Sequence, residues 1–235
     1  DDLELAGNLV AASLDISGDI DVDGTSNLDI IDVDGAANFA ADVTIATGAD
    51  LLIATAGTDN VRIGENAGDS IESGALRNIL IGKNAGTALT TGDSNVAVGW
   101  EALKTEDAHS NSVAIGASAL ATQNAGADAY NVAMGYNAGT AVTTGIQNTL
   151  IGGLAGDVLT DADYNVALGV SALGADTLGS KSVALGYSTL TNQNFTTATD
   201  TYNTAVGYTA GSSVTTGVGN TLLGSLSGDA LTDAD

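Results

Sequence analysis

The chain has 235 residues, with 31 Gly, no Pro, no Cys and a single His, and its 29 Asp and Glu against 5 Lys and Arg give a formal net charge of −24. This charge argues against a nucleic-acid partner, whose phosphates are bound by Lys and Arg, and against an anionic membrane surface. The absence of Cys excludes disulfides and thiol chemistry. No apolar run approaches the roughly 18 residues of a transmembrane helix, so we expect no membrane insertion.

Residues 1–59 form an acidic, repetitive segment without Lys or Arg. Apolar and acidic residues alternate in Asp19–Asp23 and in Ile31–Asp34, and Gly24 and Gly35 end these two stretches. A period of two is typical of strands with one apolar face and one solvated face. We therefore expect an elongated β-shaft over residues 1–59.

One stretch of this segment has half of a calcium-binding motif. Asp19, Asp21 and Asp23 precede Gly24 as in an EF-hand loop, whose twelfth position carries a bidentate Glu. That position is occupied here by Ile30, so the EF-hand interpretation fails. A solvated carboxylate face is favoured over a metal site, and we expect no cofactor, although the net charge leaves binding of a divalent cation such as calcium open.

From residue 60 to residue 235 the chain repeats a short apolar unit that ends in Gly, as in Asn131–Gly135. Successive glycines are separated by 18, 17, 17, 19, 17, 17, 17, 21 and 17 residues. A fixed period near 17 residues predicts a parallel β-solenoid, with one coil per unit and about 4.8 Å per coil. Ten coils then give a rod section of about 50 Å. The ten glycines are Gly64, Gly82, Gly99, Gly116, Gly135, Gly152, Gly169, Gly186, Gly207 and Gly224.

Each unit has two alternating faces. The residue before the glycine and the residue two positions earlier, such as Val98 and Val96, are apolar or Thr, and we expect them to form the inner core. The residues between, such as Ala97 and Asn95, would then form an outer face on which stacked Asn amides make a ladder. Because recurrent Ala on an outer face is unusual, we expect another chain to pack there.

A longer repeat overlies the coils. The fourth residue after the strand glycine reads Gly, Gly, Leu, Leu in successive coils, so the full unit is four coils, or about 72 residues. The two long spacers follow the second Leu coil of each unit, and we expect residues 122–130 and 191–202 to bulge from the same side. Thr232–Asp235 repeats Thr160–Asp163, from which we infer a piece of a longer polypeptide.

The sequence provides little that favours catalysis. His109 cannot belong to a multi-histidine zinc site, no Ser lies in a nucleophile motif, and we expect His109 on a surface loop. Carboxylates do recur, and polysaccharide-cleaving enzymes use pairs of acids. An active site is normally unique, so solvated corners or cation sites are favoured for these groups, and we expect no enzyme. The repeated acids are Asp157, Asp161 and Asp163 and their copies Asp229, Asp233 and Asp235.

Aromatic residues are the candidates for glycan contact. One set directly follows the strand glycine: Trp100, Tyr136, Tyr187 and Tyr208. A second set directly precedes the Asn of the unit: Tyr130, Tyr164 and Tyr202. Exposed aromatic rings stack on sugars, but rings at fixed coil positions also cap corners or fill a seam between chains. The packing interpretation is favoured.

Units such as Asn111–Gly116 resemble the head repeats of trimeric autotransporter adhesins, which implies a left-handed parallel β-roll assembled from three chains. The stretches Leu14–Gly24 and Asn27–Gly35 are similar to shaft segments of bacteriophage tail fibres, which also use adhesin-like repeats and are trimeric. Together the two resemblances imply an all-β trimeric tail fibre in the virion. It would mediate host attachment, with other fibre or virion proteins and a cell-surface glycan or protein receptor as partners. The alternatives are the head of a bacterial surface adhesin and a polysaccharide-degrading tailspike.

Overall fold

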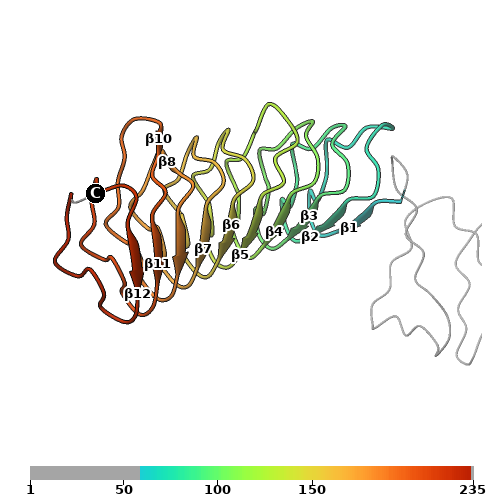
Figure 1. Ribbon diagram of the computed structural model, residues 1–235. Helices are drawn as coiled ribbons and strands as arrows, with labels where there is room; N and C mark the ends of the chain where they lie inside the picture. The colour runs from blue at the N-terminus through green and yellow to red at the C-terminus, as the bar shows by residue number, and fades with distance from the viewer. Residues whose placement is uncertain (1–58, 234–235) are drawn as a thin grey trace, which may run out of the picture. The chain divides into compact units, whose positions relative to one another are not determined.

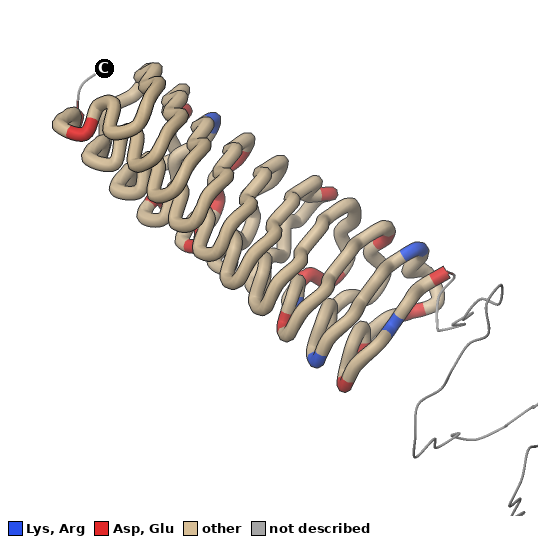
Figure 2. Tube along the Cα trace, turned by 90° about the horizontal axis from the view of Figure 1, so that it is seen from below, with Lys and Arg blue, Asp and Glu red and all other residues tan. Residues whose placement is uncertain are grey.

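The computed structural model describes residues 59–233, and over this range the chain is an all-β parallel solenoid (Figure 1). The predicted shaft, apart from Asp59, and residues 234–235 lie outside the described residues. No helix among residues 59–233 is long and apolar enough to cross a membrane. Charged residues lie mostly along the turns of the coils (Figure 2).

Ten three-residue strands form one parallel sheet, and each strand ends directly before a repeat glycine. Neighbouring strands pair in register, so that Val96 lies beside Val113 and Ala97 beside Ala114. The predicted solenoid with a period near 17 residues is therefore confirmed. In sheet order the strands are β1 (Val61–Ile63), β2 (Ile79–Ile81), β3 (Val96–Val98), β4 (Val113–Ile115), β5 (Val132–Met134), β6 (Thr149–Ile151), β7 (Val166–Leu168), β9 (Val183–Leu185), β11 (Thr204–Val206) and β12 (Thr221–Leu223).

The longer spacers bulge away from this sheet. In Figure 1 the loop between β4 and β5 and the loop before β11 both rise on the side opposite the ten strands, as their positions in the repeat predict. The second loop contains β10 (Thr199–Asp200), which pairs in parallel with β8 (Gly179–Ser180) from the preceding coil. The loops recur once per four coils on one side of the solenoid.

The predicted assignment of the two strand faces is wrong. Ala97 and Asn95 are fully buried, whereas Met134 and Leu168, at the predicted core position, are 42% and 45% exposed. The small Ala and the Asn therefore point into the coil, and the larger aliphatic side chains point out. The interior of so short a coil is narrow, and its buried backbone groups need hydrogen-bond partners, which the Asn amides supply.

The Asn residues form a ladder inside the solenoid. The backbone N–H of Asn148 donates to Oδ1 of Asn131 at 2.8 Å, and Oδ1 of Asn148 accepts from the backbone N–H of Asn165 at 2.9 Å. Nδ2 of Asn148 donates to the carbonyl oxygen of Ala162 at 2.7 Å. Each Asn thus fixes the register of the next coil and satisfies a buried carbonyl on the far side of the coil.

Core filling explains the Gly, Gly, Leu, Leu pattern. Leu150, at the centre of β6, is fully buried, and its methyl groups lie 2.7 Å and 2.9 Å from where a Cβ on Gly139 and Gly156 would be. One Leu therefore covers the corners of its own coil and of the preceding coil. In the next coil the strand centre is Ala167, and the buried Leu173 at the corner fills the same space. In each of these two coils one Leu fills the core, either from the strand centre or from the corner.

The strand glycine meets two demands at once. Gly152 has a φ of +133°, and a Cβ there would lie 2.5 Å from the carbonyl oxygen of Gly169 in the next coil. Neither this conformation nor this close approach is accessible to a residue with a side chain. The corner after β6 therefore requires glycine.

Candidate functional site

The outward strand face is a continuous uncharged surface along the solenoid. We define it as the first and third residues of the ten strands in the main sheet. None of these residues is charged, and the only polar residues among them are Thr149, Thr204 and Thr221. Nine strand spacings of about 4.8 Å and a width of roughly 10 Å give a strip on the order of 400 Å². That is the size of the largest apolar patches on monomeric proteins, which are often functional.

Sequence reasoning missed this surface because it placed the same residues in the core. The alternation correctly grouped Val96 with Val98 and Asn95 with Ala97. Both groups are free of charged residues in this coil, so hydrophobicity alone selected the more apolar one as the interior. Side-chain size is the signal that could have identified the inner face. In every coil with Leu at the corner, the residue at the strand centre is the small Ala, as expected if both positions share a narrow interior.

The glycan candidates that follow the strand glycine are all exposed, but the structure brings only two of them together. Tyr187 and Tyr208, in adjacent coils, stack with ring centroids 5.4 Å apart and an interplanar angle of 10°. Their facing surfaces are therefore covered by each other. Trp100 and Tyr136 lie in separate coils and expose their rings individually.

The second set of tyrosines lies at the other end of the strands. Tyr130, Tyr164 and Tyr202 are exposed and have φ values of +50°, +60° and +51°. Tyr202 donates to Oδ2 of Asp200 at 3.1 Å, and its ring lies 5.3 Å from Nζ of Lys181. The same Nζ is 2.5 Å from Oδ2 of Asp200.

This exposed ion pair shifts the pKa values of both of its groups. The hydrogen bond from Lys181 lowers the pKa of Asp200, and the hydrogen bond to Asp200 raises the pKa of Lys181. Because both groups are in contact with solvent, the pair adds little to stability.

Two of the repeated carboxylates join neighbouring coils. Oδ1 of Asp161 accepts from Oγ1 of Thr144 at 2.7 Å, and Oδ1 of Asp163 accepts from the backbone N–H of Ile146 at 2.8 Å. Each bond joins one coil to the preceding coil. Partial burial raises the pKa of Asp157. Of their predicted copies, Asp235 lies outside the described residues.

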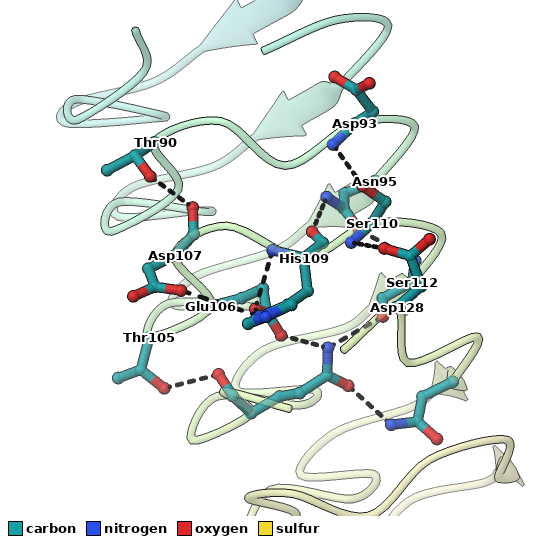
Figure 3. A network of polar contacts seen from close by, with 12 residues as sticks. Thr90, Asp93, Asn95, Thr105, Glu106, Asp107, His109, Ser110, Ser112 and Asp128 are labelled. Atoms are coloured by element: carbon teal, nitrogen blue, oxygen red, sulfur yellow. Dashed lines mark hydrogen bonds and ion pairs between the residues drawn. The ribbon is translucent and has the colours of Figure 1, made fainter. Parts of the chain in front are cut away.

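The interior of the first four-coil unit contains a buried polar network that the sequence did not reveal (Figure 3). Glu106 is fully buried, and its Oε2 accepts from Nε2 of Gln123 at 2.8 Å. The same amide nitrogen lies 2.9 Å from Oγ of Ser112, and Oε1 of Gln123 accepts from Nδ2 of Asn131 at 2.8 Å. Gln123 thus occupies the gap that the shorter Ser112 leaves in the Asn ladder.

The second four-coil unit repeats this network with one acid shortened. Nε2 of Gln193 donates to Oδ2 of Asp176 at 2.5 Å and lies 2.8 Å from Oγ of Ser182. Oδ1 of Asp176 accepts backbone N–H groups from Gly179 at 3.1 Å and from Phe195 at 3.0 Å. A buried carboxylate beside a Gln is therefore part of the repeating scaffold.

His109 lies in the loop between β3 and β4, and its half-buried ring is directed at the buried network. Nδ1 of His109 is 2.8 Å from Oε1 of Glu106 and 3.9 Å from Oδ1 of Asp107 (Figure 3). Among the described residues this is the one group of three or more His, Asp or Glu side chains with donor atoms close enough to share a metal ion.

The described residues form no enclosed pocket. Comparison with protein-family models, with curated proteins and with solved structures finds no match to this chain. The surfaces and groups available for binding in residues 59–233 are the apolar strand face, the two sets of aromatic rings and the turn that holds His109.

Proposed function

We propose that this chain is a structural and adhesive fibre segment that assembles as a homotrimer through its strand face. Its most direct place is a phage tail fibre that mediates attachment to the host cell. The observation that carries the proposal is the uncharged, apolar strip along the ten strands, on which Met134 and Leu168 are nearly half exposed. At about 25 cal/mol per Å², covering roughly 400 Å² contributes on the order of 10 kcal/mol per chain, which offsets the entropic cost of association.

Three copies in parallel suit the geometry of this strip. The ten strands present the same two positions at a constant spacing, so identical chains side by side can match coil for coil. A closed ring of such chains leaves no apolar strip in water. The resemblance of the repeats to trimeric adhesin heads supports three chains and a left-handed coil. Because the Ala and Asn side chains point into the coil, the seam between chains would be formed by the aliphatic side chains instead.

The remaining parts of the chain fit the same role. Residues 1–59 would form the acidic shaft of the fibre, and other fibre or virion proteins would adjoin it. A cell-surface glycan or protein is the receptor class, and the exposed rings of Trp100 and Tyr136 are the open aromatic surfaces for a glycan. A bacterial surface adhesin head would use the same trimer, because its repeats are those that these coils resemble.

The mass of the folded chain in solution tests the trimer. Light scattering of the 23.0 kDa chain should give about 69 kDa, which is three times the chain mass. Met134→Asp and Leu168→Asp each place a charge in the seam and should reduce the mass to that of one chain, or cause aggregation. Ala127→Asp adds the same charge on the exposed loop opposite the sheet and should leave the mass unchanged.

Two results would overturn this proposal. A folded wild-type chain with the mass of a single chain would exclude the seam, and so would Met134→Asp and Leu168→Asp proteins that stay trimeric. Antibodies against the chain separate the two locations, since they should label virions for a tail fibre and bacterial cells for an adhesin. Release of oligosaccharides from host capsule by the purified chain would indicate a tailspike enzyme instead.

A further inference from the structure

The turn at residues 106–109 combines a buried anchor with an opening to solvent. The side chain of Glu106 is fully buried, whereas those of Asp107 and His109 are 51% and 22% exposed. The donor atoms of all three lie within 4.8 Å of one another. An ion could therefore enter from the solvent side and meet a carboxylate that is already held in place.

Small movements would turn these three groups into ligands. Metal–ligand bonds of about 2.0–2.2 Å to His nitrogen and carboxylate oxygen in a tetrahedral site place ligand atoms roughly 3.4 Å apart. The distance from Nδ1 of His109 to Oε1 of Glu106 is 2.8 Å, and that to Oδ1 of Asp107 is 3.9 Å. Each distance would change by about 0.5 Å, which side-chain rotation allows.

The buried network orients the anchor from behind. Oε2 of Glu106 is held by Gln123, which is itself held by Asn131, while Oε1 faces His109 and accepts from its backbone N–H at 3.3 Å. Hydrogen bonds of this kind, to the oxygen that does not face the ion, fix a ligand and raise the affinity of metal sites.

The electrostatics of the turn favour a cation. Within residues 59–233, His109 is the one basic side chain within 4.0 Å of Glu106 or Asp107. The nearby Lys104 instead pairs with Glu101 at 3.0 Å. A buried carboxylate that has no Lys or Arg partner is stabilised by a bound metal ion.

Comparison of the two four-coil units separates the ligands from the scaffold. Asp176 occupies the position of Glu106 and keeps the Gln partner, but Thr177 and Gly179 occupy the positions of Asp107 and His109. The solenoid therefore folds around a buried acid without the second carboxylate or the imidazole. Those two groups are an addition found in the first unit.

We propose that Glu106, Asp107 and His109 bind a divalent first-row transition-metal ion of the Zn²⁺ class. An imidazole nitrogen with two carboxylate oxygens favours such ions over Ca²⁺ and Mg²⁺, which prefer all-oxygen sites. Three protein ligands leave at least one coordination position for water or another donor. Nδ1 of His109 must be unprotonated to bind, so the affinity falls in acid.

Calorimetric titration of the full chain with ZnCl₂ tests this proposal. The wild-type chain should bind about one Zn²⁺ per chain, and Asp107→Thr and His109→Gly should each weaken binding at least about 10-fold. Both variants copy the residues of the second unit, so their circular dichroism should stay unchanged. Asp161→Asn removes the same charge as Asp107→Thr from a carboxylate elsewhere and should bind Zn²⁺ like the wild type.

Binding of Cu²⁺ shows whether the imidazole is a metal ligand, because an imidazole with only a structural role would give no signal in the Cu²⁺ spectrum. The electron paramagnetic resonance spectrum of Cu²⁺ on the wild-type chain should show coupling to an imidazole nitrogen, and His109→Gly should abolish it. If the wild type and the three variants bind Zn²⁺ equally, the ion is held by the acidic surface in general and the site is refuted. Absence of binding to the wild-type chain, or loss of stability in His109→Gly without loss of Zn²⁺ affinity, would refute it too.

Discussion

Replacing Asn148 with Ala would leave two buried backbone groups without a hydrogen-bond partner. The Asn148 side chain accepts from the backbone N–H of Asn165 at 2.9 Å and donates to the carbonyl oxygen of Ala162 at 2.7 Å. All three residues are fully buried, so water cannot replace the lost partner. Each orphaned group costs about 1–3 kcal/mol, and Asn148→Ala should therefore lower the free energy of unfolding by about 2–6 kcal/mol.

Urea unfolding, followed by the fluorescence of the single Trp100 and by circular dichroism, measures this loss. Chain concentration has to be the same for every variant, because assembly contributes to apparent stability. Asn124→Ala makes the same chemical change on an exposed loop and should alter the free energy of unfolding by no more than about 0.5 kcal/mol. A cost for Asn148→Ala below about 1 kcal/mol, or equal to that of Asn124→Ala, would refute the internal ladder.

Other substitutions test the core, the corners and the titration. Leu150→Ala should cost about 3–5 kcal/mol by leaving a cavity, and adding Gly156→Leu should recover at least about 1 kcal/mol in a double-mutant cycle, since it imitates the Leu coils. Gly152→Ala should prevent stable folding, seen as loss of the circular dichroism spectrum, because its Cβ would meet the carbonyl of Gly169. Burial raises the pKa of Asp157 in the folded chain above its pKa in the unfolded chain. The contribution of this carboxyl group to stability is therefore present below the unfolded-state pKa and is lost as the pH rises through the folded-state pKa. Asp157→Asn should therefore raise the urea midpoint at pH 7 but not at pH 3.

The period of the coils and the place of each strand could be predicted from sequence because they depend on local pattern. Each of the ten strands of the main sheet ends directly before a glycine with a positive φ, and most of these glycines also lie too close to the next coil to accept a side chain, as Gly152 shows. The four-coil unit was also visible in the sequence, although its cause was not. That cause is the sharing of one Leu, such as Leu150, between the corners of two coils.

The direction of the strand faces was decided only by closure of the coil. Alternation shows that Val96 and Val98 share one face and that Ala97 and Asn95 share the other, but it does not say which face the chain wraps around. The narrow interior admits Ala and Asn and leaves the larger aliphatic residues outside.

The tertiary structure likewise brings Glu106 and Gln123 of adjacent coils together and directs His109 toward Glu106. In the sequence these residues are separated by spacers without a recognisable motif. The sequence by itself thus determined the repeat and its strands, because these follow from residues close together in the chain. The exposed apolar seam and the buried carboxylate depend on contacts between coils, and only the folded chain shows them.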